Sequence, residues 1–134
     1  MTFSHNDKVD ITSESDIVQV RTTVREKAIG IGFGITDVTR IVTAASELAR
    51  NVYRFAESGV MYFEILDEGG KKGIELRFED TGPGIGNIDL AMEEGYTTGN
   101  GLGLGLSGTR RLMDEMEIHS EVDKGTTIRV VKWL

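Results

Sequence analysis

The hydrophobic residues between positions 36 and 56 recur at steps of three and four, which is the spacing of one face of an α-helix. They form a single stripe made of Val38, Ile41, Val42, Ala45, Leu48, Ala49 and Val52. The pattern predicts a helix from Thr36 to Ala56 whose stripe packs in the protein core. Glu47 and Asn51 are four residues apart, so they are expected one turn from each other on the polar face of this helix.

A second helical pattern comes earlier in the chain and is carried by Ile17, Val20, Val24, Ala28 and Ile31. Ser13 or Ser15 is the predicted N-cap, and Asp16 is placed to favour the positive end of the helix dipole. The helix should end in the glycine series Gly30, Gly32 and Gly34. Before it, residues 1–7 are polar and expected to be disordered, and Lys8–Ile11 is predicted to form a short edge strand.

Two strands are predicted at Val60–Leu66 and Gly73–Asp80, joined by the polar loop 67–72. In the second strand Ile74, Leu76 and Phe78 share one face, because side chains alternate along a strand. The same alternation places Asp80 on that apolar face. A buried carboxylate costs several kcal/mol unless something pairs with it, so we expect Asp80 to meet hydrogen-bond donors.

The pattern of the C-terminal half predicts a turn, a short helix, a glycine-rich loop, a second helix and a hairpin. The predicted bounds are 81–84, Asn87–Glu94, 95–105, Leu106–Glu115, and the strands Met116–Val122 and Thr126–Leu134. Helices and strands in this order are most simply packed as two layers. We therefore predict one α+β domain over residues 1–134, with the helices on one face of a mixed, mostly antiparallel sheet.

Composition excludes several classes of function. The 134 residues contain no cysteine, and His5 and His119 have no neighbours at metal-ligand spacing. A net charge of −7 argues against non-specific binding to nucleic acid or to an anionic membrane. The sequence shows neither a signal peptide nor a membrane span, so a cytoplasmic protein is expected.

The glycine-rich loop leads into a helix, and exposed backbone amides at a helix N-terminus favour phosphate. The loop lacks the lysine that a Walker loop requires. Its residues Gly103–Gly108 match G-x-G-x-x-G, but they do not directly follow a strand in a parallel unit, so dinucleotide binding is not favoured.

Three features combine into a nucleotide hypothesis. A carboxylate at Asp80 would accept a hydrogen bond from the exocyclic amine of adenine and would repel the oxygen of guanine. Asn51 offers a neutral oxygen to a hydrated Mg²⁺ that also binds phosphate. Glu47, one turn away, would be placed to accept a proton from an attacking hydroxyl or water.

Each of these residues also has an ordinary interpretation. Asp80 could form a strand-end turn through an Asx hydrogen bond. Glu47 and Asn51 could be plain residues of a solvated helix face. The arginines at positions 50, 54, 110 and 111 are more often surface charges than ligands.

The motifs together resemble the GHKL family of ATP-binding domains, named for gyrase, Hsp90, histidine kinases and MutL. The N box of that family matches residues 46–51, the G1 box 80–84, the G2 lid 99–105 and a later Gly-Thr element 124–127. The resemblance implies a Bergerat-type fold that binds ATP with Mg²⁺ held through Asn51. The nucleotide ligands implied by it are Asn51, Asp80, Gly82, Gly84, Gly99, Gly101, Gly103, Gly105 and Thr126, with Glu47 as the catalytic base.

Within the family, the residues 46–51, the 111–115 run and the last strand look most like the bacterial switch serine/threonine kinases. That resemblance implies a kinase that phosphorylates STAS-domain regulators in a stressosome-type partner-switching module and then activates a PP2C-type phosphatase. The alternative is an anti-sigma factor that holds a sigma factor, with ATP as a conformational ligand. Some relatives carry an arginine in the lid, but residues 95–99 have no basic residue, which leaves the roles of Arg110 and Arg111 open.

Overall fold

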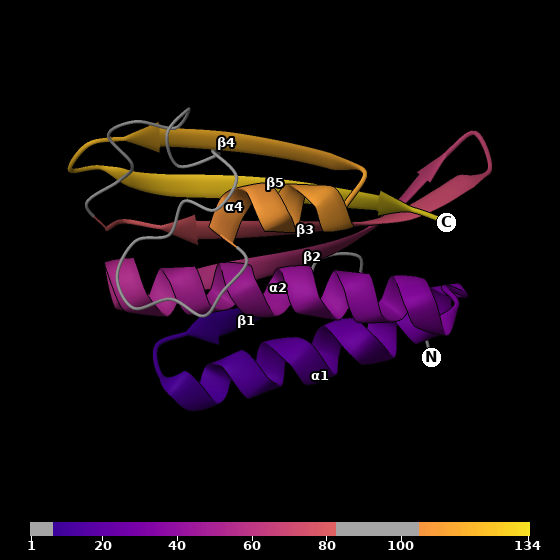
Figure 1. The fold of residues 1–134 in the computed structure, drawn as a ribbon, viewed down its shortest axis with the longest axis horizontal. Helices are drawn as coiled ribbons and strands as arrows, with labels where there is room; N and C mark the ends of the chain where they lie inside the picture. The colour runs from indigo at the N-terminus through magenta and orange to yellow at the C-terminus, as the bar shows by residue number, and fades with distance from the viewer. Residues whose placement is uncertain (1–6, 83–104) are drawn as a thin grey trace.

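The computed structural model describes residues 7–82 and 105–134 and has two layers (Figure 1). One layer holds the helices α1 (Glu14–Ile31), α2 (Ile35–Ala56) and α4 (Gly105–Leu112). The other is a sheet of β1 (Asp7–Ile11), β2 (Gly59–Glu68), β3 (Lys71–Asp80), β4 (Glu115–Glu121) and β5 (Gly125–Trp133). This arrangement confirms the predicted α+β class. The helix predicted at Asn87–Glu94 lies outside the described residues.

The strands follow the order β1-β2-β3-β5-β4, and all four described pairings are antiparallel. The predicted parallel component of the sheet is therefore wrong for this part of the chain. Its absence has a topological reason. The connection through α4 brings β4 back in the same direction as β3, but β5 is inserted between the two strands, so they are not neighbours.

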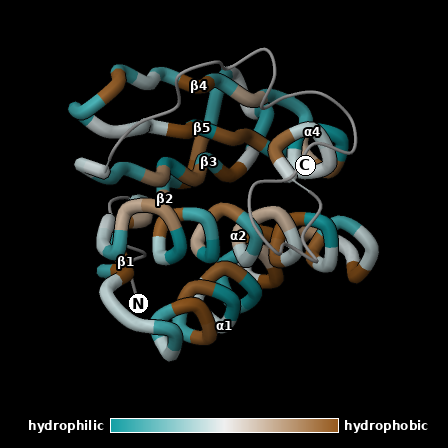
Figure 2. Tube along the Cα trace, turned by 60° about the vertical axis from the view of Figure 1, so that its left-hand side comes forward, coloured by the Kyte–Doolittle hydropathy of each residue, from teal (hydrophilic) through white to brown (hydrophobic). Residues whose placement is uncertain are grey.

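The core lies between the layers, and both layers contribute hydrophobic stretches to it (Figure 2). Every residue of the stripe predicted on α2 is buried. The β3 residues predicted to face the core, Ile74, Leu76 and Phe78, are also buried, with at most 1% of each exposed. Burying one such side chain stabilises the fold by roughly 1.5–3 kcal/mol, so this contact is the main force between the layers.

Helix α1 begins at the N-cap Ser13, one of the two predicted positions. The Asp16 carboxylate accepts hydrogen bonds from the backbone N–H groups of Thr12 (2.9 Å) and Ser13 (3.1 Å). The carboxylate thereby satisfies backbone N–H groups at the start of the helix that would otherwise have no acceptor. The helix ends before Gly32, whose φ of 118° is a left-handed conformation that favours glycine.

Strand β1 is an edge strand, as predicted, but it begins at Asp7 rather than Lys8. Asp7 pairs with Phe63 of β2 and forms an ion pair with Lys27 of α1. The disorder expected for residues 1–7 therefore does not extend to Asp7, and residues 1–6 lie outside the described residues.

The β2–β3 hairpin is tighter than predicted. Both strands continue past the expected loop and leave Gly69 and Gly70 as the turn, with φ of 61° and 87°. Two successive positive φ values are what a two-residue turn with the correct twist requires. Four charged residues and two glycines had indicated a loop, whereas the pairing of Asp67 with Lys72 and of Glu68 with Lys71 keeps the four charged residues in the sheet.

Helix α4 ends at Leu112, so the prediction that it reaches Glu115 was wrong, and Glu115 instead opens β4. The reason lies in the last strand. Lys132 donates a hydrogen bond to the carbonyl of Leu112 (3.2 Å), and Asp114 donates through its backbone N–H to Val131 (2.9 Å). These contacts satisfy the helix end and draw the next residues into the sheet.

The face of the sheet away from the helices is charged. Arg129 pairs with Glu75 and lies 3.7 Å from both Glu115 and Glu117. Arg77 pairs with Glu79 at 2.5 Å. No helix in the described ranges is long and apolar enough to cross a membrane.

Asp16 gives the first testable prediction. Its pKa is lowered from the ordinary value of 3.8, chiefly because the backbone N–H of Thr12 donates to the carboxylate. A lowered pKa stabilises the fold above the unfolded-state value, and this contribution is lost as the pH falls through the folded-state value. Asp16→Asn should therefore flatten the fall of unfolding free energy with acid, measured by urea unfolding over a pH series. Glu14→Gln is the matched control, and equal acid slopes for Asp16→Asn and the native chain would contradict the assignment.

Candidate functional site

Asp80 is the last residue of β3, and its carboxylate joins two segments. Its Oδ1 atom accepts hydrogen bonds from the backbone N–H groups of Gly82 (2.9 Å) and Thr126 (3.3 Å). The first bond is the Asx bond of the turn interpretation. The second comes from 46 residues further along the chain, so the carboxylate does more than form a local turn.

The other carboxylate oxygen of Asp80, Oδ2, receives no hydrogen bond from residues 7–82 or 105–134. An ionised carboxylate has about four acceptor positions on its two oxygens. Acceptor capacity therefore remains for a donor supplied from outside the described chain, such as the amine of a base.

Three glycines allow the backbone to close around Asp80. A Cβ atom on Gly125 would lie 2.1 Å from the carbonyl oxygen of Asp80, and Gly125 has a φ of 118°. A Cβ on Gly82 would lie 2.6 Å from that of Ala56, at the end of α2, and one on Gly59 would lie 2.5 Å from the carbonyl of Glu79. Strand β3, the β4–β5 turn and the end of α2 therefore converge here.

Thr126 lies opposite Asp80 in the β3–β5 ladder. Its hydroxyl oxygen is 2.8 Å from that of Ser120, which also donates to the carbonyl of Gly125 at 3.2 Å. Sequence reasoning did not identify Ser120. The signal was present in the predicted hairpin, because pairing around Asp123–Gly125 places position 120 opposite 126.

Glu47 and Asn51 both lie on α2 and both are half-buried. The side chain of Glu47 is 14% exposed and forms an ion pair with Arg50 at 2.7 Å. The ordinary interpretation of Glu47 as a residue of a solvated helix face is therefore wrong. Helix α2 lies between α1 and α4 (Figure 1), and Ala44 and Ser46 are buried beside the predicted stripe.

Only some of the predicted glycine ligands belong to the described residues. Gly82 lies against Ala56. Gly105 is the first residue of α4, with a φ of 70°, and its carbonyl accepts a hydrogen bond from the Thr109 hydroxyl at 3.0 Å. Arg110 and Arg111 are exposed in the last turn of α4. Gly84, Gly99, Gly101 and Gly103 lie outside the described residues.

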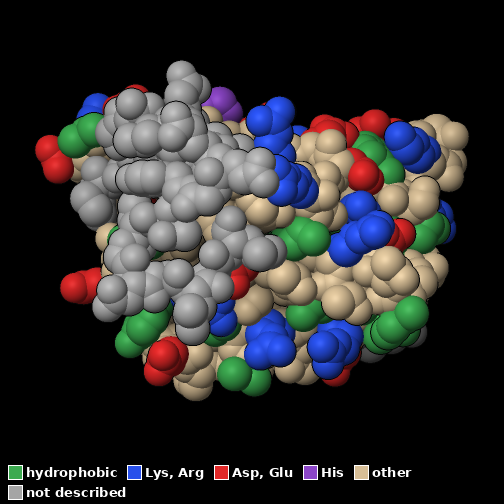
Figure 3. Space-filling model, in the orientation of Figure 1, with side chains coloured by type: hydrophobic (Ala, Val, Ile, Leu, Met, Phe, Trp, Pro, Cys, Tyr) green, Lys and Arg blue, Asp and Glu red, His purple; other side chains and the backbone are tan. Residues whose placement is uncertain are grey.

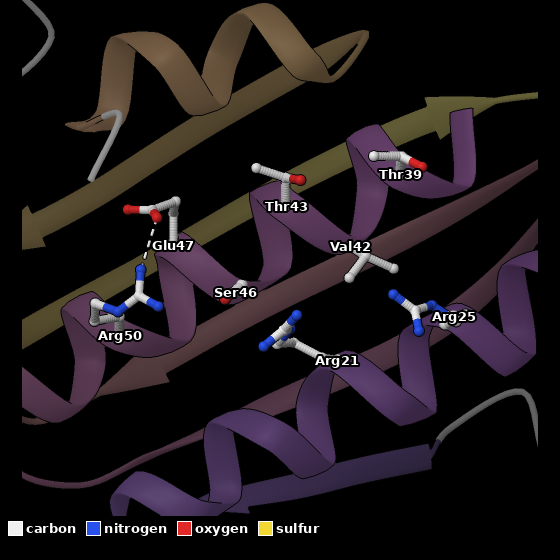
Figure 4. Close-up of a pocket in the computed structure, with 8 residues that line it drawn as sticks. All are labelled: Arg21, Arg25, Thr39, Val42, Thr43, Ser46, Glu47 and Arg50. Carbon is white, nitrogen blue, oxygen red and sulfur yellow. Dashed lines mark hydrogen bonds and ion pairs between the residues drawn. The ribbon is translucent and has the colours of Figure 1, made fainter. Parts of the chain in front are cut away.

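A hollow of about 310 Å³ lies between α1 and α2 (Figure 4). Its lining consists of Arg21, Arg25, Thr39, Val42, Thr43, Ser46, Glu47 and Arg50. We call it the arginine groove. It does not contain Asp80 or Thr126, but it shares Glu47 with the predicted nucleotide site. Sequence reasoning had treated Arg50 as a surface charge and had not considered Arg21 or Arg25.

The fold and these residues agree with what comparison with known proteins finds. Residues 36–134 match the family described as histidine kinase-, DNA gyrase B-, and HSP90-like ATPase. The chain belongs to this family, as the motifs of the sequence predicted.

Among its relatives is the serine/threonine-protein kinase RsbT of Bacillus subtilis (strain 168), which is 48% identical over 94% of this chain and 95% of its own length. This relationship confirms the predicted enzyme class, a serine/threonine kinase. The anti-sigma F factor of Anoxybacillus flavithermus is 34% identical over 75% of this chain and 72% of its own length.

Solved structures share the fold. The RsbU and RsbW domains of Rv1364c from Mycobacterium tuberculosis align with a TM-score of 0.64 at 20% identity, over 94% of this chain and 32% of theirs. The mycobacterial sensor histidine kinase MprB aligns with a TM-score of 0.58 at 18% identity, over 96% of this chain and 97% of its own.

Gly125 gives a prediction about the structure of this site. Gly125→Ala should lower the free energy of unfolding by about 1–3 kcal/mol, because the new Cβ meets the Asp80 backbone and the φ is unfavourable for alanine. Urea unfolding measures the loss. The control is Gly69→Ala, where φ is also positive but nothing lies within 4 Å. A loss of unfolding free energy for Gly125→Ala no larger than for Gly69→Ala would show that Gly125 does not pack tightly against the Asp80 backbone.

Proposed function

We propose that this chain is a cytoplasmic kinase that uses Mg-ATP to phosphorylate a STAS-domain regulatory protein in a partner-switching module. When released from that partner, it activates a PP2C-type phosphatase. The relationship to a serine/threonine-protein kinase supports the reaction class. The observation that carries the nucleotide part is the Asp80 carboxylate, with one oxygen held by two backbone donors and the other without a donor among the described residues.

In this proposal Asp80 reads adenine. The base amine donates to Oδ2, while the bonds from Gly82 and Thr126 to Oδ1 fix the carboxylate in place. A positioned acceptor discriminates strongly against a base that presents an oxygen at the same point, because both groups are acceptors and neither can donate to the other. Thr126, aligned by Ser120, supplies a second polar group at the same edge.

Asn51 is proposed to hold Mg²⁺ through its amide oxygen. Within residues 7–82 and 105–134 no group of three or more acidic or histidine side chains could hold a metal ion. A single neutral oxygen fits an ion that takes most of its ligands from phosphate and water, as Mg²⁺ commonly does. When bound, the ion would neutralise charge on the phosphates.

Glu47 is proposed as the general base. It would accept the proton of a substrate serine or threonine hydroxyl as the hydroxyl oxygen bonds to the γ-phosphorus, and the bond from that phosphorus to the β–γ bridging oxygen would break to release ADP. A positioned base contributes about 10²–10⁴-fold to such a rate. The ion pair with Arg50 at 2.7 Å holds the Glu47 carboxylate in a defined position on α2.

The positions along α2 support this assignment of roles. Ala56, at the end of the helix, contacts Gly82 beside Asp80. Asn51 and Glu47 follow at successively greater distances from that end, and Glu47 lies about 13.5 Å along the axis from Ala56 at about 1.5 Å per residue. Asp80, Asn51 and Glu47 are thus arranged in the same order as the adenine, the phosphates and the attacking hydroxyl that they are proposed to contact. The glycine lid over the phosphates remains a prediction.

A second candidate function is an anti-sigma factor whose partner is a sigma factor, which the 34% identity to the anti-sigma F factor favours. An assay for phosphate transfer to a protein distinguishes the kinase function from the anti-sigma function. A kinase of the first kind modifies a STAS-domain protein in the absence of any sigma factor, whereas sequestration needs only complex formation.

Asp80→Asn tests the nucleotide site. Calorimetry with Mg-ATP should show binding by the native chain and a loss of at least about tenfold in affinity for Asp80→Asn, because the amide cannot accept as a charged oxygen does. Thermal unfolding of the variant reports separately on the structural bonds of Oδ1. Equal heats for the native chain and the variant, or no heat for either, would contradict the proposal.

Glu47→Ala tests the base. The variant should bind Mg-ATP like the native chain but lose about 10²-fold or more in phosphate transfer to a STAS-domain protein, followed with radiolabelled ATP. Glu57→Ala, an exposed acid just past the end of α2, is the control. Unchanged transfer by Glu47→Ala would remove Glu47 from this role.

A further inference from the structure

The arginine groove is a basic site on an acidic protein. The chain has a net charge of −7, yet Arg21, Arg25 and Arg50 line one hollow. Figure 3 shows Lys and Arg side chains over α1 along the lower edge of the helix face. In Figure 4 the guanidinium groups of Arg21 and Arg25 extend from α1 toward α2.

Two of the groove arginines have no acidic partner in the described part of the chain. Arg21 and Arg25 are exposed and form no ion pair within residues 7–82 and 105–134. Four other arginines, among them Arg40 and Arg129, do pair with acidic side chains: Arg40 lies 3.2 Å from Asp37, and Arg129 pairs with Glu75. The groove therefore presents two positive charges that the described chain does not neutralise.

The rest of the lining suits a peptide rather than a small ion alone. Val42 and Ser46 are buried at the base of the groove, and Thr39 and Thr43 bring hydroxyl groups from successive turns of α2. An extended segment would find apolar contact and hydrogen-bond partners along α2, and its carboxylates would meet the arginines from α1.

The position of the groove along α2, next to Glu47, indicates what the groove binds. Along α2 the residues run from Ala56, beside Asp80, through Glu47 to Thr43 and Thr39. The groove therefore extends from Arg50 and Glu47 in the direction away from the adenine end of the site. A segment bound there would place a neighbouring hydroxyl next to Glu47 and opposite the nucleotide.

We propose that the arginine groove binds an acidic segment of the protein substrate, close to the serine or threonine that is phosphorylated. This inference rests on the proposed kinase function for its choice of substrate. The binding of an acidic segment depends only on the residues of the groove and not on the kinase reaction. Arg21 and Arg25 hold the carboxylates of the segment, and Arg50, paired with Glu47, marks the end of the groove at which the hydroxyl enters.

Steady-state kinetics with a STAS-domain protein that the native chain phosphorylates tests the proposal. Arg25→Gln should raise the KM for that protein about threefold and Arg25→Glu about tenfold or more, with kcat and the affinity for Mg-ATP unchanged. Added salt should raise the native KM toward that of Arg25→Gln, because the attraction is screened. The control is Arg40→Glu, an exposed arginine on α2 outside the groove, which should leave the KM within about twofold.

A binding measurement separates failure of this inference from failure of the kinase proposal. The probe is a fluorescein-labelled peptide of alternating glutamate and serine, and its matched control replaces glutamate with lysine. Fluorescence anisotropy should show that the native chain binds the acidic peptide, that Arg25→Glu does not, and that neither binds the lysine peptide. This result without any phosphate transfer would support the groove and overturn the kinase proposal.

Two outcomes would overturn the groove proposal while the kinase proposal stands. One is a KM and a peptide affinity for Arg25→Glu equal to those of Arg40→Glu. The other is a loss of Mg-ATP affinity in Arg25→Gln with the KM for protein unchanged, which would assign the groove to the nucleotide. Circular dichroism of each variant confirms that α1 is intact before either result is interpreted.

Discussion

The burial of α2 is the constraint on which the rest of the structure depends. Its apolar stripe packs on the sheet, and its flanks pack on α1 and α4, so little of its circumference reaches solvent. A helix in this position can present polar groups only along a narrow strip. Glu47, Arg50 and Asn51 occupy that strip, all of them half-buried. Because the helix is held on both sides, these groups are fixed relative to the sheet, which is what a site that must align a proton acceptor with a bound ligand requires.

Asp80 shows how one carboxylate can have a structural and a recognition role together. Its Oδ1 atom links the turn at Gly82 to Thr126 of β5, and the absence of a side chain at Gly125 lets the two backbones approach closely enough for this bond. A carboxylate with one oxygen held in this way cannot rotate freely, so the second oxygen has a defined direction. Recognition of a base by that oxygen therefore depends on backbone contacts between segments that are far apart in sequence.

The distribution of charge separates the two faces of the molecule. On the open face of the sheet, arginines are surrounded by glutamates, as Arg129 is by Glu75, Glu115 and Glu117. On the helix side, Arg21 and Arg25 stand together in a groove. The net charge of −7 would repel an acidic partner at long range, but the Debye length at about 0.1 M salt is only about 10 Å. At contact the local arginines therefore decide which segment binds, and the overall charge affects mainly the rate of encounter.

The sequence by itself determined the features that depend on local pattern: the stripe of α2, the alternation in β3 that brings Asp80 to the core side, and the order of the family motifs. It narrowed the N-cap of α1 to Ser13 or Ser15, and the structure selects Ser13. It did not determine where α4 ends, because that depends on Lys132 and Val131, some 20 residues beyond Leu112. Nor could it show that β5 lies between β3 and β4, that the side chain of Glu47 is only 14% exposed, or that Arg21 and Arg25 of one helix share a groove with Arg50 of the next. Periodicity reports which side of an element is apolar, whereas only the packing of elements against one another decides which polar side chains meet and how much water reaches them.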